Sequence, residues 1–421
     1  MKMNVIELPQ NSWYGEEQAH ISLPADWDIR VNDIPADSLN KMTEEEIQEK
    51  ISCPNSSGNL RELAAKRNKA VIIFDDLSRP TRLDRIAPFV VEQLLAGGIK
   101  EEQISFIAAL GAHGAHTRLD FAKKLGEEII SRFPVYNHNP YENCLYVGKT
   151  RSGFPLYFNR EFLSADLKIA MGCILPHAFN GFGGGGKLLL PGIAAMETIQ
   201  TIHTQAVDDL KNRGVGFVGN MGLNENSRMQ EEIDDAIKIT KLDFLINVLP
   251  NSSREAVALV AGDPIIAYQE GVGIAKNIYI TDYHHNADVV ITNANAKANE
   301  ALIALLMGAK SLKKTGGDLV TVVNCPTGQI IHYLFGRFGE NYGGKLCLSD
   351  DIIPERVKRS IIYSRYPGQC YGLDRRAVES TSWADVLNML QQENGKGTKA
   401  VIYLDGTMQY LDPSQVAAVA D

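Results

Sequence analysis

Apolar runs of strand length alternate with segments of helical period along most of the chain. The run AVIIFDD, residues 70–76, has the continuous apolar pattern of a buried strand, and residues 83–98 follow it with apolar positions at helical spacing. The runs ISFIAALG and LKIAMGCI repeat the strand pattern, and DFLINVLP, IYITDYHHNADVVITNA and DLVTVVNCP add further strands. Strands that alternate with helices favour a parallel sheet, so the sequence predicts an α/β fold.

The length and the order of these segments predict two domains, each with a largely parallel sheet flanked by helices. A chain of 421 residues can bury two cores of ordinary size. The predicted helix PIIAYQEGVGIAK ends near residue 275, where a second series of strands and helices begins, so we expect domains at residues 1–274 and 275–421. Residues 117–133, TRLDFAKKLGEEIISRF, are predicted to form one helix.

Charge and cysteine content narrow the class of protein. The chain has 42 Lys and Arg against 51 Asp and Glu and no long basic run, which makes nucleic acid and anionic membranes poor partners. It shows neither a signal-peptide core nor an apolar run of membrane-spanning length, and a cytoplasmic location is predicted. Six scattered cysteines without a C-x-x-C pair argue against a zinc ribbon or a disulfide framework: Cys53, Cys144, Cys173, Cys325, Cys347 and Cys370.

The glycine-rich stretch GFGGGGKLLLPG, residues 181–192, is the most unusual part of the sequence. It reads G-x-x-x-x-G-K like a phosphate-binding P-loop, but Leu188 stands where a P-loop needs Ser or Thr. Four successive glycines are costly to order, so they indicate a sharp bend or close contact with a ligand. Burial in such a loop would lower the pKa of Lys187 and make its amine nucleophilic. A flexible surface loop is the alternative, although the apolar LLLPG that follows favours burial.

Two polar loops follow predicted strands, at the sheet edge where α/β proteins bind ligands. In DDLSRPTR, Asp76 and Ser78 can accept and donate hydrogen bonds, and Arg79 offers a fork suited to carboxylate or phosphate. A capped turn before a helix explains the same residues without a ligand. In GAHGAHT, His113 and His116 can each serve as general base, metal ligand or structural residue.

Two further histidines flank the glycine-rich stretch. His177 lies just before it, and His203 lies on a predicted helix beyond it, where a lone histidine is usually a packing residue. The adjacent His284 and His285 have no ligand spacing and are predicted to lie on the surface.

Taken together, DDLSRPT, GAHGAHT, LPHAFNGFGGGGKLLLPG and the histidine sixteen residues after Lys187 resemble the nickel-dependent lactate racemase family in order and spacing. That family uses a nickel pincer nucleotide, a pyridinium-3,5-bisthiocarboxylate-type mononucleotide whose sulfur and carbon atoms chelate nickel. The cofactor is often tethered through a thioamide to the loop lysine. The resemblance implies cofactor binding and catalysis in residues 1–274, a C-terminal domain that closes over a site at the interface, and cofactor-biosynthesis proteins as partners of the holo form.

The resemblance also implies residue roles. Lys187 matches the tether, whether covalent or by charge alone, and His203 matches the protein ligand to nickel. His113 and His177 match an acid/base pair, one for each face of the substrate. The nucleotide is expected against Asp76, Ser78, Gly183, Gly184, Gly185 and Gly186, and the substrate against Arg79, His116 and Lys297.

The implied reaction is inversion at C2 of a 2-hydroxy acid. A histidine removes the hydroxyl proton while hydride leaves C2 to the cofactor, and return of hydride to the other face of the planar keto acid inverts the configuration. The chain departs from lactate racemases: it has His113-Gly114-Ala115 in place of His-Arg-Pro, and a Tyr-Gln pair is missing near Lys297. We therefore expect a substrate other than lactate, such as a sugar acid or a hydroxy-dicarboxylate.

Two other functions are compatible with these motifs. One is a catalytically silent protein that binds the nickel nucleotide. The other is a P-loop-like nucleotide hydrolase, against which Leu188 and the six residues LPHAFN between strand and glycines both argue.

Overall fold

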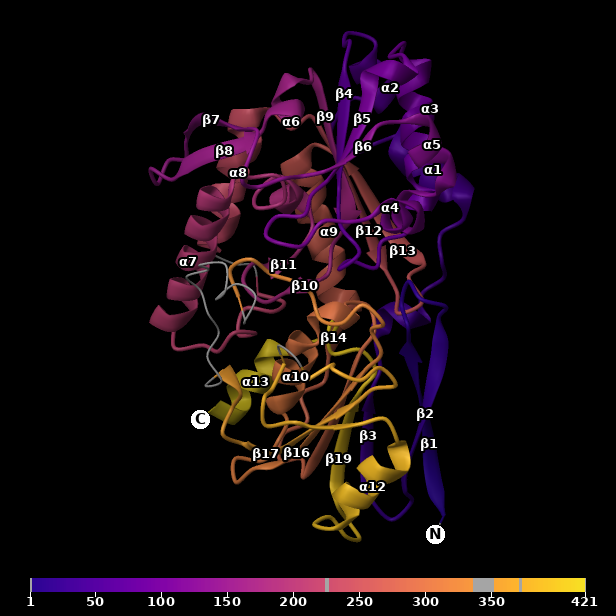
Figure 1. The fold of residues 1–421 in the computed structure, drawn as a ribbon, viewed down its shortest axis with the longest axis vertical. Coiled ribbons are helices and arrows are strands. Elements are labelled where there is room, and N and C mark those ends of the chain that lie inside the picture. The colour runs from indigo at the N-terminus through magenta and orange to yellow at the C-terminus, as the bar shows by residue number, and fades with distance from the viewer. Residues whose placement is uncertain (1, 224–226, 336–351, 371–372, 421) are drawn as a thin grey trace.

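Two six-stranded sheets form the core of the computed structural model, which describes residues 2–223, 227–335, 352–370 and 373–420 (Figure 1). The first sheet has the order β13-β12-β9-β4-β5-β6, formed by β4 (Ala70–Phe74), β5 (Ile104–Ala108), β6 (Val135–Asn137), β9 (Leu167–Cys173), β12 (Phe244–Pro250) and β13 (Ala256–Gly262). The second has the order β18-β17-β16-β15-β19-β3, formed by β3 (Asp28–Asn32), β15 (Val289–Ala294), β16 (Gly317–Val323), β17 (Val357–Tyr363), β18 (Val378–Ser380) and β19 (Lys399–Tyr403).

Both sheets are largely parallel. Every pair of neighbours in the second sheet is parallel, and in the first sheet only β12 and β13 pair antiparallel. Parallel strands need helical crossovers that cover both faces, which is why β4 is buried at all five positions. The predicted α/β class is confirmed.

Helices cover the sheets in the order set by the chain. Figure 1 shows α9 running between the two halves and α7 and α8 together on one side. The α-helices are α1 (Glu44–Ser52), α2 (Leu60–Ala64), α3 (Ala87–Ala96), α4 (Arg118–Leu125), α5 (Glu127–Arg132), α6 (Arg160–Ser164), α7 (Met196–Asn212), α8 (Arg228–Thr240), α9 (Pro264–Ile278), α10 (Leu302–Ala309), α12 (Trp383–Gln391) and α13 (Pro413–Ala420). Short 3-10 turns are η1 (Pro35–Ser38), η2 (Leu83–Arg85), η3 (Glu101–Gln103), η4 (Gly185–Leu188) and η5 (Ala298–Glu300).

Four two-stranded ladders complete the fold. They pair β1 (Met3–Gln10) with β2 (Glu17–Pro24), β7 (Cys144–Lys149) with β8 (Pro155–Asn159), β10 (Pro176–His177) with β11 (Gly181–Phe182), and β14 (Ile280–Thr281) with β20 (Tyr410–Leu411). The β10–β11 hairpin matters most for the site, because it separates β9 from the glycine-rich stretch.

The structure corrects one predicted helix. Residues 117–133 form α4 and α5 rather than a single helix, and Gly126 lies between them with φ 84°. Only glycine adopts this left-handed backbone at little cost, so the chain turns there. Thr117 caps α4 through a capping box with Asp120.

The two sheets divide the chain in a way that the domain prediction only partly anticipates. Strands of the first sheet lie between residues 70 and 262, and those of the second between 289 and 403, except that β3 from the N-terminal region pairs with β19. The boundary between residues 274 and 275 therefore falls between the sheets but leaves β3 on the N-terminal side. It stays a prediction.

No helix in the described part of the chain is long and apolar enough to cross a membrane. Five of the six cysteines lie in the described residues and are free thiols: Cys53, Cys144, Cys173, Cys325 and Cys370. Cys347 lies outside the described residues.

Candidate active site

A cavity of about 580 Å³ lies where the carboxyl ends of both sheets meet. The loops after β4, β5 and β9 form one wall, and the loops after β15, β16 and β17 form the other. The predicted site residues that line it are Asp76, Arg79, His113, His177, Gly183, Gly184, Lys187 and His203. Ser78, His116, Gly185, Gly186 and Lys297 lie behind its surface. Eight residues selected from sequence thus meet around one cavity of ligand size.

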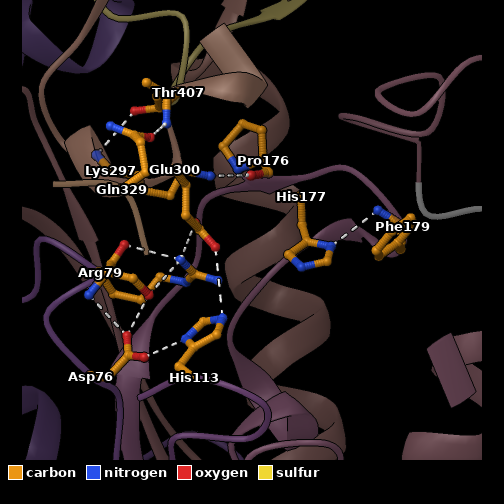
Figure 2. Close-up of polar contacts among 12 residues, drawn as sticks. Asp76, Arg79, His113, Pro176, His177, Phe179, Lys297, Glu300, Gln329 and Thr407 are labelled. Atoms are coloured by element: carbon orange, nitrogen blue, oxygen red, sulfur yellow. Dashed lines mark hydrogen bonds and ion pairs between the residues drawn. The ribbon is translucent and has the colours of Figure 1, made fainter. Parts of the chain in front are cut away.

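Asp76 and His113 form a hydrogen-bonded pair at this cavity (Figure 2). His113 Nδ1 lies 2.5 Å from Asp76 Oδ2, and the other carboxylate oxygen accepts hydrogen bonds from the backbone N–H and the hydroxyl of Ser78. Burial alone would raise the pKa of Asp76, but the charge and hydrogen bond of His113 outweigh it and hold that pKa well below its usual range. The ionised Asp76 carboxylate accepts from the Nδ1–H of His113 and so holds the ring with Nε2 toward the cavity.

A fully buried lysine holds the loop that carries Asp76 and Arg79. Lys124 of α4 lies 2.7 Å from Asp75 Oδ1, and its Nζ donates to the backbone carbonyls of Asp76 and Arg79 at 3.0 Å each. Burial raises the pKa of Asp75, and the Lys124 ammonium opposes that rise. Three oxygen partners around one ammonium fix the backbone on both sides of the Asp76 side chain.

Lys124→Met is therefore expected to destabilise the fold by about 3–5 kcal/mol, because it removes the cation that is paired with the buried Asp75 carboxylate and the ammonium donor to the carbonyls of Asp76 and Arg79. Urea unfolding followed by circular dichroism measures the change. Lys123→Met is the matched control, since the Lys123 ammonium on the same helix lies over the Tyr14 ring at 3.9 Å from its centroid and a loss of about 1 kcal/mol or less is expected. Equal losses of stability in the two variants would contradict the role of Lys124 in holding this loop.

His116 supports the same loop from behind. The ring Nε2 of His116 accepts a hydrogen bond from the backbone N–H of Leu77 at 3.0 Å, and the backbone N–H of His116 donates to Asn137 Oδ1 at 2.9 Å. Burial lowers the pKa of His116, which favours the neutral acceptor seen here. This geometry gives His116 a structural role, and contact with substrate stays a prediction without support from its position.

The four glycines divide into two pairs. Gly183 and Gly184 line the cavity, and a Cβ on Gly184 would stand 2.5 Å from the carbonyl oxygen of Cys173. A Cβ on Gly185 would meet the Tyr268 ring at 2.5 Å, and one on Gly186 would meet a methyl carbon of α8 at the same distance. Close packing accounts for Gly185 and Gly186, so contact between these two and a nucleotide stays a prediction. The first pair presents bare backbone to the cavity.

The backbone around these glycines differs from that of a P-loop. A P-loop runs from a strand directly into a helix, whereas here the β10–β11 hairpin and the four-residue turn η4 follow β9. The next long helix, α7, begins only at Met196. The structure thus gives no support to the P-loop-like hydrolase.

Lys187 lines the cavity as a half-buried side chain, and no carboxylate of the described residues forms an ion pair with its amine, although the charge of Glu300 acts on it. The hydrogen-bond acceptor nearest its Nζ is the sulfur of Met229, 3.9 Å away. Burial and, to a smaller degree, the charge of Arg79 lower the pKa of Lys187 to about 7. A large fraction of this amine is therefore unprotonated and nucleophilic near neutral pH.

His203 lies on the buried face of α7 and lines the same cavity. Its Nδ1–H donates to the carbonyl of Ile199 at 2.7 Å, and burial lowers its pKa to about 4. Nε2 therefore carries an unprotonated lone pair, which is the form that binds a metal. Among the residues that the structure describes, no three His, Cys, Asp or Glu side chains are grouped to hold a metal ion. A metal at His203 would need further ligands from a non-protein group.

His177 has the opposite hydrogen-bonding pattern to His113. Its Nδ1 accepts from the backbone N–H groups of Phe179 and Asn180 at 3.1 and 3.3 Å (Figure 2). Burial and the neighbouring Lys187 keep the pKa of His177 well below its ordinary value, so the ring is neutral and its proton is on Nε2. His177 thus presents an Nε2–H to the cavity, whereas His203 presents an unprotonated Nε2.

Lys297 is fully buried just behind the cavity wall. Its Nζ donates to the carbonyl of Pro176 at 3.1 Å, next to His177, and burial lowers its pKa to about 8. In this position Lys297 links the second sheet to the β10–β11 hairpin. Direct contact between Lys297 and substrate stays a prediction.

Sequence reasoning missed two cavity residues from the second half of the chain. Glu300 forms an ion pair with Arg79 at 2.6 Å, and His332 lies edge-on to both His113 and His203 with ring centroids 5.4 and 5.7 Å away. His332 Nδ1 accepts a hydrogen bond from the backbone N–H of Leu334. The backbones of His332 and His113 form an isolated antiparallel β-bridge. Glu300 lies shortly after the carboxyl end of β15, a position that could have singled it out, whereas His332 stands in no glycine-rich or strand-end motif.

Comparison with known proteins matches this arrangement to one family. The sequence profile described as the lactate racemase N-terminal domain matches residues 14–214. The chain is 28% identical over 334 residues to the lactate racemase of Thermoanaerobacterium thermosaccharolyticum, covering 77% of this chain and 75% of that protein. It is also 28% identical over 295 residues to the lactate racemase of Lactiplantibacillus plantarum, covering 69% of this chain and 68% of that protein.

Solved structures share the fold. The lactate racemase apoprotein of T. thermosaccharolyticum superposes with a TM-score of 0.74 at 20% sequence identity, over 97% of this chain and 100% of that chain. A protein of Thermotoga maritima superposes with a TM-score of 0.62 at 18% identity, over 88% of this chain and 99% of that chain. In sequence the chain is thus similar to lactate racemases, through the N-terminal domain match and the two relatives, and in fold it is similar to a lactate racemase apoprotein.

Proposed function

We propose that this chain is a racemase or epimerase that inverts C2 of a 2-hydroxy acid with the help of a nickel pincer nucleotide. The observation that carries the proposal is the gathering of His113, His177, Lys187 and His203 around one cavity. Their hydrogen bonds prepare each of them for a different task. Similarity to the lactate racemases supports the class of reaction.

The cavity residues fit the cofactor that the family implies. Lys187 offers an unprotonated amine for attachment, and His203 offers one metal ligand with a fixed tautomer. Gly183 and Gly184 offer a wall without side chains. When bound, the cofactor supplies a hydride acceptor next to C2 of the substrate. We propose that cofactor-biosynthesis proteins supply it to the chain.

The histidines of this chain handle the hydroxyl proton. His113 Nε2 accepts it, and Asp76 stabilises the imidazolium that forms because the carboxylate is ionised and 2.5 Å from Nδ1. His177 presents its Nε2–H from the β10–β11 hairpin and donates a hydrogen bond to the oxygen on C2 at the opposite face of the substrate, and it must take up a proton before it can return one to that oxygen. Arg79 provides the guanidinium for the substrate carboxylate.

The substrate is proposed to differ from lactate. Glu300 already neutralises part of the Arg79 charge, so the cavity presents a second polar group beside the carboxylate site. A sugar acid or a hydroxy-dicarboxylate is proposed, and of the two only the sugar acid has extra hydroxyl donors to meet the Glu300 carboxylate. A chain that binds the nickel nucleotide without catalysis is the second candidate.

Stereoinversion with retention of label tests the proposal. The chain, purified from cells that also make the nickel pincer nucleotide, is expected to convert one enantiomer of a C2-deuterated 2-hydroxy acid into the other with the deuterium kept at C2. Chiral chromatography with mass detection measures both. Retention is expected because hydride leaves and returns within one closed site, whereas a carbanion would exchange with solvent protons.

The outcomes separate the alternatives. Inversion with loss of deuterium would reject hydride transfer. Bound nickel without inversion of any member of a broad 2-hydroxy acid panel would favour the silent binding protein.

A further inference from the structure

Glu300 belongs to the loop after β15 of the second sheet, and its side chain contacts residues in the loops of the first sheet that line the cavity. It is the last residue of η5, shortly after the carboxyl end of β15, and its side chain is 15% exposed. Its Oε2 lies 2.6 Å from Arg79 Nη1, and its Oε1 lies 3.9 Å from His113 Nε2 (Figure 2). Glu300 thus stands between the group proposed to bind the substrate carboxylate and the group proposed to take the hydroxyl proton.

Glu300 is an ionised acceptor in this position. Burial alone would raise its pKa, but Arg79 and Lys297 outweigh burial and lower it. The hydrogen bond from Arg79 goes to Oε2, and within the described residues no donor bonds Oε1. This oxygen lines the cavity and is therefore placed to accept a hydrogen bond from a ligand.

We propose that Glu300 is a specificity-determining residue that selects substrates with a hydroxyl group on C3 as well as C2. This inference rests on the proposed function and names its substrate class, the 2,3-dihydroxy acids of the aldonate type. His113 Nε2 and Glu300 Oε1 are two acceptors 3.9 Å apart. Hydroxyl groups on adjacent carbons present two donors to such a pair, the first as the reacting group and the second for recognition.

Other 2-hydroxy acids fit this arrangement less well. An acid with a methyl group at C3 offers Oε1 no donor, and polar sites of this kind reject analogues that lack the matching group. An acid with a second carboxylate brings a negative charge next to Glu300 in a site of low dielectric. A C3 hydroxyl avoids both problems.

Competition between substrates tests the inference. For the holoenzyme, kcat/KM for glycerate is expected to exceed kcat/KM for lactate and for malate by about a hundredfold or more. Glu300→Gln is expected to reduce the glycerate-to-lactate ratio about tenfold and to raise malate relative to glycerate. Glu270→Gln, at an exposed position on α9, is the matched control and is expected to leave both ratios unchanged.

The ratios distinguish recognition from simple support of Arg79. A residue that only orients Arg79 would lower kcat/KM for all three acids together, so an unchanged ratio in Glu300→Gln would overturn the inference. So would a wild-type preference for lactate or malate.

A binding measurement keeps the inference separate from the proposed function. If the wild type inverts no 2-hydroxy acid, the proposed function fails. Calorimetric binding of glycerate, lactate and malate to the purified chain still tests Glu300. Tighter binding of glycerate that is lost in Glu300→Gln supports the inference, and equal affinities for the three acids overturn it.

Discussion

His113→Ala and His177→Ala are each expected to lower the turnover number for stereoinversion about a thousandfold, while nickel bound per chain stays unchanged. The two residues line the cavity on different loops and are held by different partners. Removing either leaves one face of the substrate without a group for its hydroxyl proton, so inversion stops in both variants. Chiral chromatography gives the turnover number, and elemental analysis of the purified protein gives the nickel content.

A histidine away from the cavity, His285, provides the control for these two variants. His285→Ala removes an exposed histidine that packs against Tyr283, with ring centroids 5.9 Å apart, and is expected to keep full turnover. Turnover retained in both cavity variants would reject the pair of histidines as acid and base. Nickel lost together with activity would instead assign the residue to cofactor binding.

Much of the fold could be predicted because the apolar pattern is strong. Continuous apolar runs such as β4 and β12 are typical of strands buried on both faces, and they alternate with helices for most of the chain. The placement of β3 could not be predicted in this way. Its partner β19 lies more than 360 residues further along the chain, and a five-residue strand with mixed burial gives no sign of which sheet it joins.

The first wall of the cavity could be predicted for a physical reason. Parallel strands bring their carboxyl ends to one edge, so loops that follow β4, β5 and β9 meet wherever those strands are neighbours. This rule brings Asp76, His113 and His177 together without any knowledge of side-chain contacts. It says nothing of which glycines face a ligand, and only the structure shows that Gly185 and Gly186 pack against a tyrosine ring and a helix.

The second wall could not be predicted, because it depends on how the two sheets meet. Glu300 reads in the sequence as an acidic residue near the start of α10, and His332 reads as a single polar position in an apolar run. Their role follows from contacts with Arg79 and with His113 in the other half of the molecule. The specificity proposed for Glu300 therefore rests on the part of the site that local sequence patterns describe least.

Lys187→Met is expected to abolish the cofactor-sized mass increment that the wild type shows when it is produced together with the cofactor-biosynthesis proteins. The intact mass under denaturing conditions measures it, because only a covalent attachment survives unfolding. Lys187→Arg keeps a positive charge but cannot form the tether. A mass increment absent from the wild type, together with nickel retained under native conditions in Lys187→Arg, would show that the cofactor is held by charge alone.

The same substitution should stabilise the chain without cofactor, and its pH dependence gives an independent test of the buried amine. The pKa of Lys187 is about 7 in the folded state and near its ordinary 10.5 when unfolded. Between these values the unfolded state binds more protons, so wild-type stability rises with pH through that window, and below pH 7 the penalty is present in full. Lys187→Met removes it. Urea unfolding should show the variant more stable than the wild type by on the order of 3 kcal/mol at pH 7, with the difference shrinking toward pH 10. A difference independent of pH would mean that Lys187 is not desolvated, and an amine in that state would be too fully protonated at neutral pH to serve as the attachment site.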